Sequence, residues 1–432
     1  MTGPWRQAVA VAMAAILLAA SCGGGDDSQA GATATPSAPA TPSAPASTAE
    51  PTAAPVTSPP VAAPELVIGR VLPETGSLAA SLGGALITGV ELAVADINAQ
   101  GGNVKLLAGD SATDPDVAPE TVNRLLGEGA HVIIGAGASG VSQSFIQTLS
   151  DAQVPQCAAS NTSPSFSTQA NADFYFRTVT VAVGESQVMA NSMASRGATN
   201  VAIANRADDY GASLAQLLAD DLAELGVTSQ TVTFDPGAPS FDATVAQILD
   251  MGADAVGLIA FEEGIAITRR LIEMGVPSWA IHLTAGQFDF SMPERVNPTD
   301  PTVVDGLRVQ SPSGSEEFNQ RVFEKTGGNA IYGGQAYDCA VILALAALAA
   351  GGIDGPTIIA AVPEITRGGQ KCHSYGECAE LVVQGVDIDY DGVSGPLEMD
   401  DVGDTTVGRY VLAEVRNGEL EVIETVDVTI DQ

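Results

Sequence analysis

Glycine and serine residues at the end of one apolar run could hold an anion. Gly135-Ala-Gly-Ala138-Ser139-Gly140 follows the run HVII and leads into a predicted helix, so it satisfies the pattern GxGxxG. A dinucleotide site would need an acidic residue about twenty positions later, and that region reads CAASN. The N–H groups at the helix start and the Ser139 hydroxyl instead suit a smaller anion such as a carboxylate. As an alternative, Ser139 only caps its helix.

A second polar turn follows the next apolar run. Ser160, Asn161 and Thr162 come directly after VPQCAA and before Pro164. Because adjacent parallel strands end at the same edge of a sheet, these groups could hold polar ligand atoms beside Ser139. A simple Ser/Thr turn is the alternative.

Two further apolar runs end in residues that could reach into a cleft. NVAIAN is followed by DDYG at a helix start, where Tyr210 offers a ring and a hydroxyl. DAVGLIA is followed by Phe261, Glu262 and Glu263, an apolar plate with two carboxylates. As alternatives, Tyr210 packs near a hinge and the two acids belong to a charged first helical turn.

Catalytic and metal-binding patterns are missing from the sequence. It contains no GxSxG, HExxH or P-loop motif, and its three histidines are isolated. No cysteine spacing fits zinc. We therefore predict a protein that is not an enzyme and that needs no metal or cofactor.

Short β-rich runs alternate with helical patterns from Glu65 onward, which is typical of parallel α/β sheets. Strands are predicted near 66–72, 104–110, 131–137, 154–160, 200–205, 229–234, 254–260 and 279–284. Helices are predicted near 84–100, 117–128, 141–152, 184–196, 211–225, 240–251, 263–274, 315–326 and 333–350. Two short late strands are predicted near 381–384 and 407–423.

The series of alternating strands and helices thus occurs twice along the chain, which predicts an α/β fold with two doubly wound, Rossmann-like lobes. Lobe 1 is predicted to comprise residues 65–179 plus 310–395. Lobe 2 is predicted to comprise 180–309 plus 396–432. Chain crossings near 179, 309 and 395 would together make a hinge.

The net charge and the first residues indicate an exported protein. Asp and Glu total 52 against 17 Lys and Arg, a formal charge of −35 that disfavours binding to nucleic acid. Residues 1–21 have one early arginine, an uncharged run and small residues before Cys22, which predicts a signal peptide and a lipid on Cys22. A plain secretory signal is the alternative. Residues 22–64 are rich in Pro, Ala, Ser and Thr, which predicts a disordered tether to the membrane.

Four cysteines remain after Cys22, in a compartment that permits disulfides. Cys372 and Cys378 lie in the loop-like stretch KCHSYGEC, and we expect this pair to be bonded. A bond between Cys157 and Cys339 would depend on a tertiary contact, so it stays a suggestion.

Several of these segments together resemble a known family. They are ELVIGRVLPETGSLAASLG, TGVELAVADINAQGG, GAHVIIGAGAS, VPQCAASNTSP, FRTV and DDYG. They look like the periplasmic leucine/isoleucine/valine-binding family, the type I solute-binding proteins of branched-chain amino acid ABC importers. The resemblance runs from about 65 to 400, and the loop from Cys372 to Cys378 is similar to relatives found as lipoproteins.

The resemblance implies the type I periplasmic-binding-protein fold and a set of ligand contacts. Ser139 and the following N–H groups would hold a ligand carboxylate, with Ala138 and Gly140 beside them. Ser160 and Thr162, with Asn161 between them, would share in binding the carboxylate and the ammonium. Tyr210 would close over the ligand from lobe 2. Phe261 would pack against it, and Leu82 would touch its side chain.

One departure from the family pattern concerns the ammonium of an amino-acid ligand. Relatives that bind amino acids place an acidic residue after the strand predicted near 279–284, and this chain has Thr284-Ala285-Gly286-Gln287 there. We keep Gly286 as a site residue. Either Glu262 or Glu263 replaces the missing acid, or the ligand has no ammonium and is an organic acid, an amide or another small polar nutrient.

The sequence therefore predicts a monomeric trap that closes on a small solute and presents it to an ABC transporter permease. A ligand-sensing module that reports the same solute to a membrane receptor is the alternative. An envelope hydrolase is a third class, and it lacks a recognisable nucleophile and base.

Overall fold

The structure is a computed structural model that describes residues 64–328 and 330–430. These residues belong to one unit, Ala62–Gln432. The predicted signal peptide, Cys22 and the predicted tether up to residue 63 lie outside the described residues.

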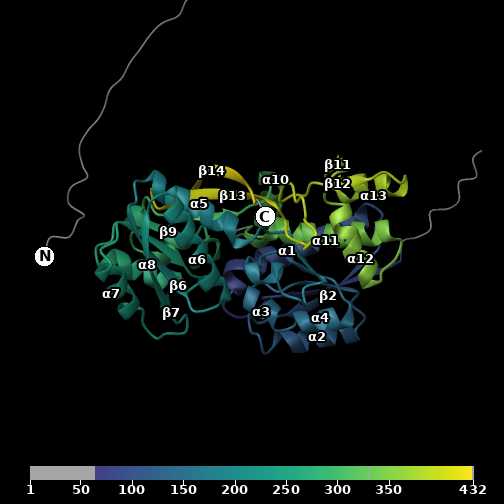
Figure 1. Ribbon diagram of the computed structural model, residues 1–432, viewed down its shortest axis with the longest axis horizontal. Coiled ribbons are helices and arrows are strands. Elements are labelled where there is room, and N and C mark those ends of the chain that lie inside the picture. Colours follow the sequence, from purple (N-terminus) through teal and green to yellow (C-terminus); the bar gives the residue numbers. More distant parts are fainter. Residues whose placement is uncertain (1–63, 329, 431–432) are drawn as a thin grey trace, which may run out of the picture. The chain divides into compact units, whose positions relative to one another are not determined.

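Five parallel strands form the sheet that defines lobe 1, in the order β2-β1-β3-β4-β5. Strand β2 of this sheet is labelled in Figure 1. They are β1 (Leu66–Leu72), β2 (Val104–Asp110), β3 (Val132–Gly135), β4 (Gln156–Ala158) and β5 (Tyr175–Arg177). The helices between them are α1 (Gly84–Ala99), α2 (Ala118–Gly127), α3 (Ser139–Gln143) and α4 (Ile146–Ala152). Strand β3 reads VIIG and is buried throughout, as expected for a strand covered on both faces.

Seven strands form the sheet that defines lobe 2, in the order β14-β13-β10-β9-β8-β6-β7. They are β6 (Asn200–Arg206), β7 (Thr228–Phe234), β8 (Ala255–Ile259), β9 (Ile281–Leu283), β10 (Arg308–Pro312), β13 (Val407–Arg416) and β14 (Glu419–Thr429). The helices are α5 (Ala182–Ser195), α6 (Asp209–Glu224), α7 (Asp242–Asp250), α8 (Gly264–Glu273) and α9 (Met292–Val296). Strands β6 to β10 run parallel, β13 pairs antiparallel to β10, and β14 pairs antiparallel to β13.

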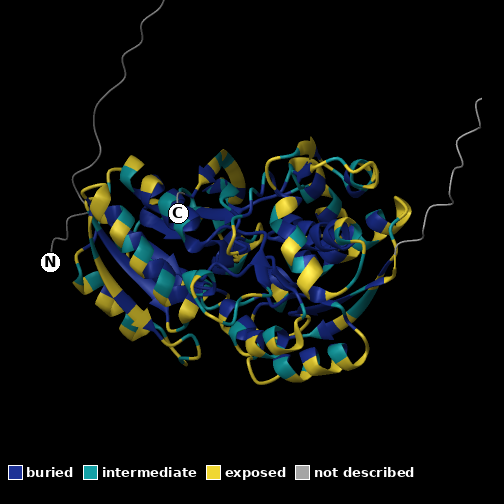
Figure 2. Ribbon diagram, turned by 45° about the vertical axis from the view of Figure 1, so that its right-hand side comes forward, coloured by how far each residue is buried: buried dark blue, intermediate teal, exposed yellow. Residues whose placement is uncertain are grey.

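The chain returns to lobe 1 after β10. It forms α10 (Glu316–Thr326), α11 (Gly333–Ala350), α12 (Gly355–Glu364), β11 (Gln370–Cys372), α13 (Tyr375–Val383) and β12 (Ile388–Tyr390). Helix α11 is mainly apolar, with Gln335 and Asp338 as buried polar residues, and it is buried from Gly333 to Ala347 because it packs against α1 and the sheet. Most other helices show buried residues on one side and exposed residues on the other (Figure 2).

The strand predicted near 381–384 is wrong, because these residues lie at the end of α13. The Ser374 hydroxyl accepts a hydrogen bond from the Glu377 N–H at 3.3 Å, and the Glu377 carboxylate accepts one from the His373 N–H at 2.9 Å. These local bonds stabilise a helix start and outweigh the β propensity of the two valines that follow.

Three chain crossings connect the two sheets, after β5, after β10 and between β12 and β13. Thr180 on the first crossing forms a β-bridge with Thr405 on the third. The fold class predicted from the sequence, two doubly wound lobes with a hinge of three crossings, is confirmed by this topology and by the structural neighbours described below.

The described residues contain two disulfides, one between segments far apart in the sequence and one within a short loop. Cys157 on β4 is bonded to Cys339 on α11, and Cys372 on β11 is bonded to Cys378 on α13. The first bond therefore fixes the returning helix to the sheet of lobe 1.

Candidate functional site

A small cavity lies beyond the carboxyl ends of strands from both sheets. In lobe 1 the chain order reverses between β1 and β3, and in lobe 2 it reverses between β6 and β8. Ligands of open parallel sheets bind beyond the carboxyl ends of strands at such reversals. The cavity is lined by Leu82, Gly137, Ala138, Ser139, Ser160, Tyr210, Phe261, Gly286 and Tyr332. Its walls thus follow β1, β3 and β4 of lobe 1 and β6, β8 and β9 of lobe 2.

The residues that line the cavity leave little empty space between them. It has about 20 Å³ for the centres of water-sized molecules, which is room for about one water. Leu82, Ser139 and Tyr332 are each 3% exposed. In this conformation the cavity therefore has no room for a solute much larger than water.

The polar wall comes from lobe 1. The Ser160 hydroxyl donates to the Gly137 carbonyl at 2.8 Å, and the Asn161 amide donates to the Ala136 carbonyl at 2.9 Å. Both bonds hold the glycine-rich turn after β3 in place. Ser139 starts α3, which is only five residues long, so the helix dipole adds little, and the Ser139 hydroxyl and backbone N–H groups are the donors that this turn offers.

The aromatic wall comes mainly from lobe 2. The rings of Tyr210 and Phe261 stack with their centroids 5.2 Å apart, and the Arg206 guanidinium lies 3.8 Å from the Phe261 centroid. Gly286 leaves room for this ring, since a Cβ there would lie 2.4 Å from Phe261 Cδ1. Tyr332 adds a third ring from lobe 1, at the start of α11, with a left-handed backbone of φ 57°.

The two acids predicted near the site are held by arginines instead. Glu262 bonds to Arg295, and the Glu263 carboxylate lies 2.8 Å from Arg206. Neither residue lines the cavity. Both acids follow Phe261 in the turn before α8, from where Glu262 reaches Arg295 on α9 and Glu263 reaches Arg206 at the end of β6.

A different acid, Glu185 on α5, lies buried behind Tyr210. One Glu185 oxygen accepts hydrogen bonds from the Ala285 N–H at 2.9 Å and from the Tyr210 hydroxyl at 3.4 Å. Burial raises the pKa of Glu185 to about 7, despite the hydrogen bonds that favour its charged form. The sequence did carry a signal for it, because Glu185 is the one charged residue of an otherwise uncharged helix.

The structure brings most of the predicted site residues together. Those that line the cavity are Leu82, Ala138, Ser139, Ser160, Tyr210, Phe261 and Gly286. Those that do not are Gly140, Asn161, Thr162 and Glu262. Thr162 lies behind the wall, where its carbonyl accepts from the Ala182 N–H at 2.8 Å. Sequence reasoning missed Gly137, Tyr332 and Glu185.

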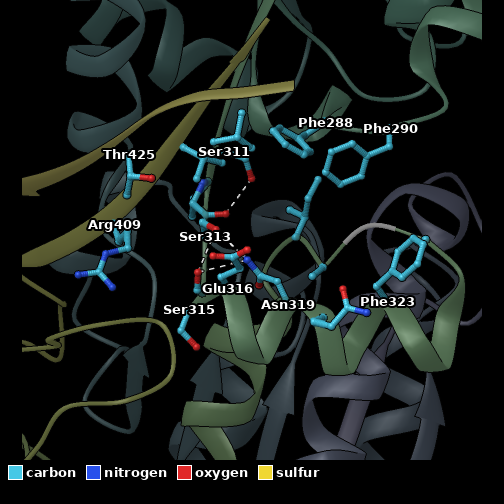
Figure 3. Close-up of a pocket in the computed structure, with 18 of the residues that line it drawn as sticks. Phe288, Phe290, Ser311, Ser313, Ser315, Glu316, Asn319, Phe323, Arg409 and Thr425 are labelled. Carbon is cyan, nitrogen blue, oxygen red and sulfur yellow. Dashed lines mark hydrogen bonds between the residues drawn. The ribbon is translucent and has the colours of Figure 1, made fainter. Parts of the chain in front are cut away.

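A larger cleft lies beside this cavity, with a volume of about 800 Å³ (Figure 3). Phe288, Phe290 and Phe323 line one side, and Ser311, Ser313, Arg409 and Thr425 line the other. Some residues that line the cleft are close in sequence to residues that line the small cavity. Phe288 lies two residues after Gly286, and Ile331 directly precedes Tyr332. Among its lining residues, the Asn319 amide is bonded to Ser313 at 3.2 Å. The cleft flanks the second hinge crossing.

One acidic cluster in the described residues has the spacing of metal ligands. Carboxylate oxygens of Asp389, Asp391 and Glu398 lie within 4.8 Å of one another. The Lys371 ammonium lies between them, 2.7, 2.9 and 2.8 Å from the three carboxylates. A side-chain cation therefore occupies the position that a metal would take.

Comparisons with known proteins agree with this architecture. The family model described as periplasmic binding protein matches residues 65–419. Leu/Ile/Val-binding protein homolog 2 of Brucella abortus (strain 2308) is 32% identical over 221 residues, which cover 49% of this chain. The aligned part spans only 58% of that relative's length.

Two further relatives align over most of their length. The chemotactic signal transduction system substrate-binding protein BasB of Halobacterium salinarum is 28% identical, covering 83% of this chain and 89% of the relative. The crystal structure of the leucine-binding protein LivK of Thermotoga maritima superposes with a TM-score of 0.70 at 21% identity, covering 84% of this chain and 98% of that one. At this identity the structural likeness shows the fold alone.

Proposed function

The chain belongs to the periplasmic binding protein family, a family of solute-binding proteins, and on that premise we propose that it delivers a small polar solute to an ABC import permease. The solute class that we propose is an amino acid or a related carboxylate. The protein acts outside the cytoplasmic membrane, as a monomer and without a cofactor. The two moving bodies are lobe 1 (65–179 plus 310–395) and lobe 2 (180–309 plus 396–432).

The observation that carries this proposal is the origin of the cavity walls. Ser139 and Ser160 come from lobe 1, whereas Tyr210 and Phe261 come from lobe 2. A solute held by both walls binds the closed form more tightly than the open form. It therefore shifts the population toward closure, and a permease can recognise the closed form.

Each wall has a separate task in this proposal. The Ser139 hydroxyl and the backbone N–H groups near Ala138 bind the carboxylate, because charge-assisted hydrogen bonds are strong in a site shielded from water. The Ser160 hydroxyl gives its proton to the Gly137 carbonyl, so its oxygen accepts from the ammonium of an amino-acid solute. Leu82, Phe261 and Tyr332 contact the apolar part of the solute. Asn161 and Thr162 act from behind the wall by holding its turns.

Thermal unfolding in the presence of candidate solutes tests the proposal. A solute at about 100 times its Kd should add about 2.7 kcal/mol to the free energy of unfolding. Amino acids and small organic acids are tested with the wild type, Ser139→Ala and Tyr210→Ala. Stabilisation that is lost in both variants supports the site. If no solute stabilises the wild type and neither substitution has an effect, the site is misplaced.

The membrane anchor is a separate part of the proposal. A lipid on Cys22 followed by the tether 22–64 would keep the folded part at the outer face of the membrane. The Cys22→Ser variant should then appear in the soluble fraction, while the wild type sediments with membranes. Equal distribution of the two proteins contradicts the anchor and leaves the solute site untouched.

A sensing role is the second candidate function. The relative from Halobacterium salinarum is named for a chemotactic signal transduction system, and it aligns over most of its length. In that case the closed form docks on a receptor rather than on a permease. Affinity purification of the solute-loaded protein from its own membranes distinguishes the two, because the retained partner is an ABC permease in one case and a receptor in the other.

A further inference from the structure

The buried carboxyl of Glu185 is incompletely hydrogen bonded. Glu185 is 0% exposed, and one of its oxygens accepts from the Ala285 N–H, the Tyr210 hydroxyl and, at 3.5 Å, the Gln310 amide. The other oxygen, Oε2, has no hydrogen-bond partner among the described residues, and neither does Gln310 Oε1. Such unsatisfied acceptors cost free energy, so this site is built for a donor that arrives with a proton or with a ligand.

Cations of the protein do not satisfy this carboxyl. The nearby acids Glu262 and Glu263 have arginine partners, but no arginine or lysine is among the groups that shift the pKa of Glu185. The titratable groups that face it are Tyr210 from α6, Tyr332 from the start of α11 and Tyr410 from β13. Burial raises the pKa of all three hydroxyls, so they are neutral.

Tyr210 connects this carboxyl to the cavity. Its ring lines the cavity and its hydroxyl donates to Glu185. When Glu185 is charged, it holds the proton of this hydroxyl, and the Tyr210 oxygen is an acceptor that the neighbouring Thr284 hydroxyl and a ligand can share. When Glu185 is protonated, that preference is lost.

We infer that Glu185 is a positioning residue that makes the cavity select solutes carrying an ammonium group, by orienting the Tyr210 hydroxyl as an acceptor and by supplying a buried negative charge. This inference rests on the proposed solute-binding function. It places the charge on a helix of lobe 2, in a chain that has Thr284-Ala285-Gly286-Gln287 after the strand where relatives that bind amino acids place an acid.

The pH dependence of binding follows from the geometry. An ammonium favours the charged form of Glu185, so an amino acid should bind more tightly as pH rises through about 7 and should release a proton below it. The gain between about pH 6 and about pH 8 should be about tenfold, which is the change in the charged fraction. A carboxylate without an ammonium should bind more weakly as pH rises, because two negative charges then share the site.

Isothermal titration with a matched pair of solutes tests this inference. Leucine and 4-methylpentanoate differ only by the ammonium group, and each is titrated at about pH 6 and about pH 8 into the wild type, Glu185→Gln and Tyr210→Phe. Glu273→Gln is the control, because Glu273 is an exposed acid on α8 of the same lobe. We expect Glu185→Gln to weaken leucine about tenfold or more and to remove its pH dependence. We expect Tyr210→Phe to weaken leucine as well but to keep part of the pH dependence, because the Glu185 carboxyl still titrates in that variant. We expect Glu273→Gln to behave as the wild type.

Each result supports or overturns the inference. Equal leucine affinity in the wild type and Glu185→Gln, with the same pH dependence, overturns it. Binding of carboxylates but of no amino acid also overturns it, while the proposed function stands. Absence of binding for every solute at both pH values means that the proposed function itself fails. If Glu185→Gln does not fold, proton release by the wild type, measured in two buffers of different ionisation enthalpy, still decides the matter.

Discussion

Arg177 and Asp404 form an ion pair that is closed to solvent, although they are 227 residues apart in sequence. The Arg177 Nε lies 2.6 Å from an Asp404 carboxylate oxygen, and the side chains are 0% and 2% exposed. Arg177 also donates to the carbonyls of Asn161 and Ser163, at 3.0 and 2.8 Å. The pair thus ties the first and third hinge crossings to the turn that carries Ser160.

Asp404→Asn should destabilise the protein strongly. The substitution leaves the Arg177 charge buried without its counter-ion, which costs about 3–5 kcal/mol. Asp427→Asn is the control, because the Arg409–Asp427 pair is at a similar distance, 2.9 Å, but exposed, and should contribute less than about 1 kcal/mol. Denaturant unfolding of both variants measures the difference. Equal losses would show that the buried pair does not stabilise the hinge.

The two disulfides should differ in their contribution to stability. Cys157 and Cys339 are separated by 182 residues, and Cys372 and Cys378 by 6. Closing the longer loop removes more entropy from the unfolded chain, about 5 kcal/mol against about 2 kcal/mol. Unfolding of the Cys157→Ser/Cys339→Ser and Cys372→Ser/Cys378→Ser double variants measures the two contributions. A larger loss from the short-loop variant would contradict the entropic argument.

Repeating patterns of apolar residues made most helices and strands predictable from the sequence. Contacts between distant segments of the chain could not be predicted in this way. The helix predicted at 333–350 is α11, because its long apolar run ends at Gly351 in a left-handed conformation. The strand predicted near 381–384 was wrong because the capping box Ser374–Glu377 was overlooked, although both residues are visible in the sequence.

The candidate site was predictable where its residues directly follow strands. Ser139, Ser160, Tyr210 and Phe261 all do so, and all line the cavity. Tyr332 lines the cavity from the residue before α11, and Glu185 lies behind Tyr210 in the first turn of α5. Only the packing of those helices brings them there, so the single charge on α5 did not by itself assign Glu185 to the site.

Gly286→Ala should disturb the aromatic wall. A Cβ at this position would lie 2.4 Å from Phe261 Cδ1 and 2.7 Å from the Ala260 carbonyl oxygen, so the Phe261 ring must move. Such overpacking costs about 1–3 kcal/mol and should also weaken solute binding.

The matched control is Gly140→Ala, since a Cβ there meets no atom within 4 Å. Gly140 lies on α3, where alanine is the better helix former by about 0.5–1 kcal/mol. This variant should be at least as stable as the wild type. Thermal unfolding with and without solute measures both effects, and similar behaviour of the two variants would place Gly286 outside the site.

The stability of the solute-free protein should depend on pH through Glu185. Burial raises the pKa of Glu185 from 4.5 to about 7 in the folded protein, so the folded state holds this proton more tightly than the unfolded chain does. The resulting stabilisation is complete below about pH 4.5 and is lost as pH rises to about 7. It amounts to about 3 kcal/mol. Glu185→Gln has no such titration, so the free energy of unfolding of the wild type, relative to this variant, should fall across this window.

Asp338 is a second buried carboxyl with a raised pKa. Its effect on stability has the same direction as that of Glu185 but is expected in a lower pH range. Burial raises its pKa from 3.8 to about 6, against hydrogen bonds from Ser394, Tyr390 and Val393. The wild type relative to Asp338→Asn should therefore lose stability between about pH 4 and about pH 6 and little more above that. Urea unfolding of the three proteins over this range separates the two carboxyls. The free energy of unfolding of the wild type and of Glu185→Gln could instead change in parallel from pH 4 to pH 8. In that case the pKa of Glu185 is not raised, and the proposed role of Glu185 in binding an ammonium group is excluded.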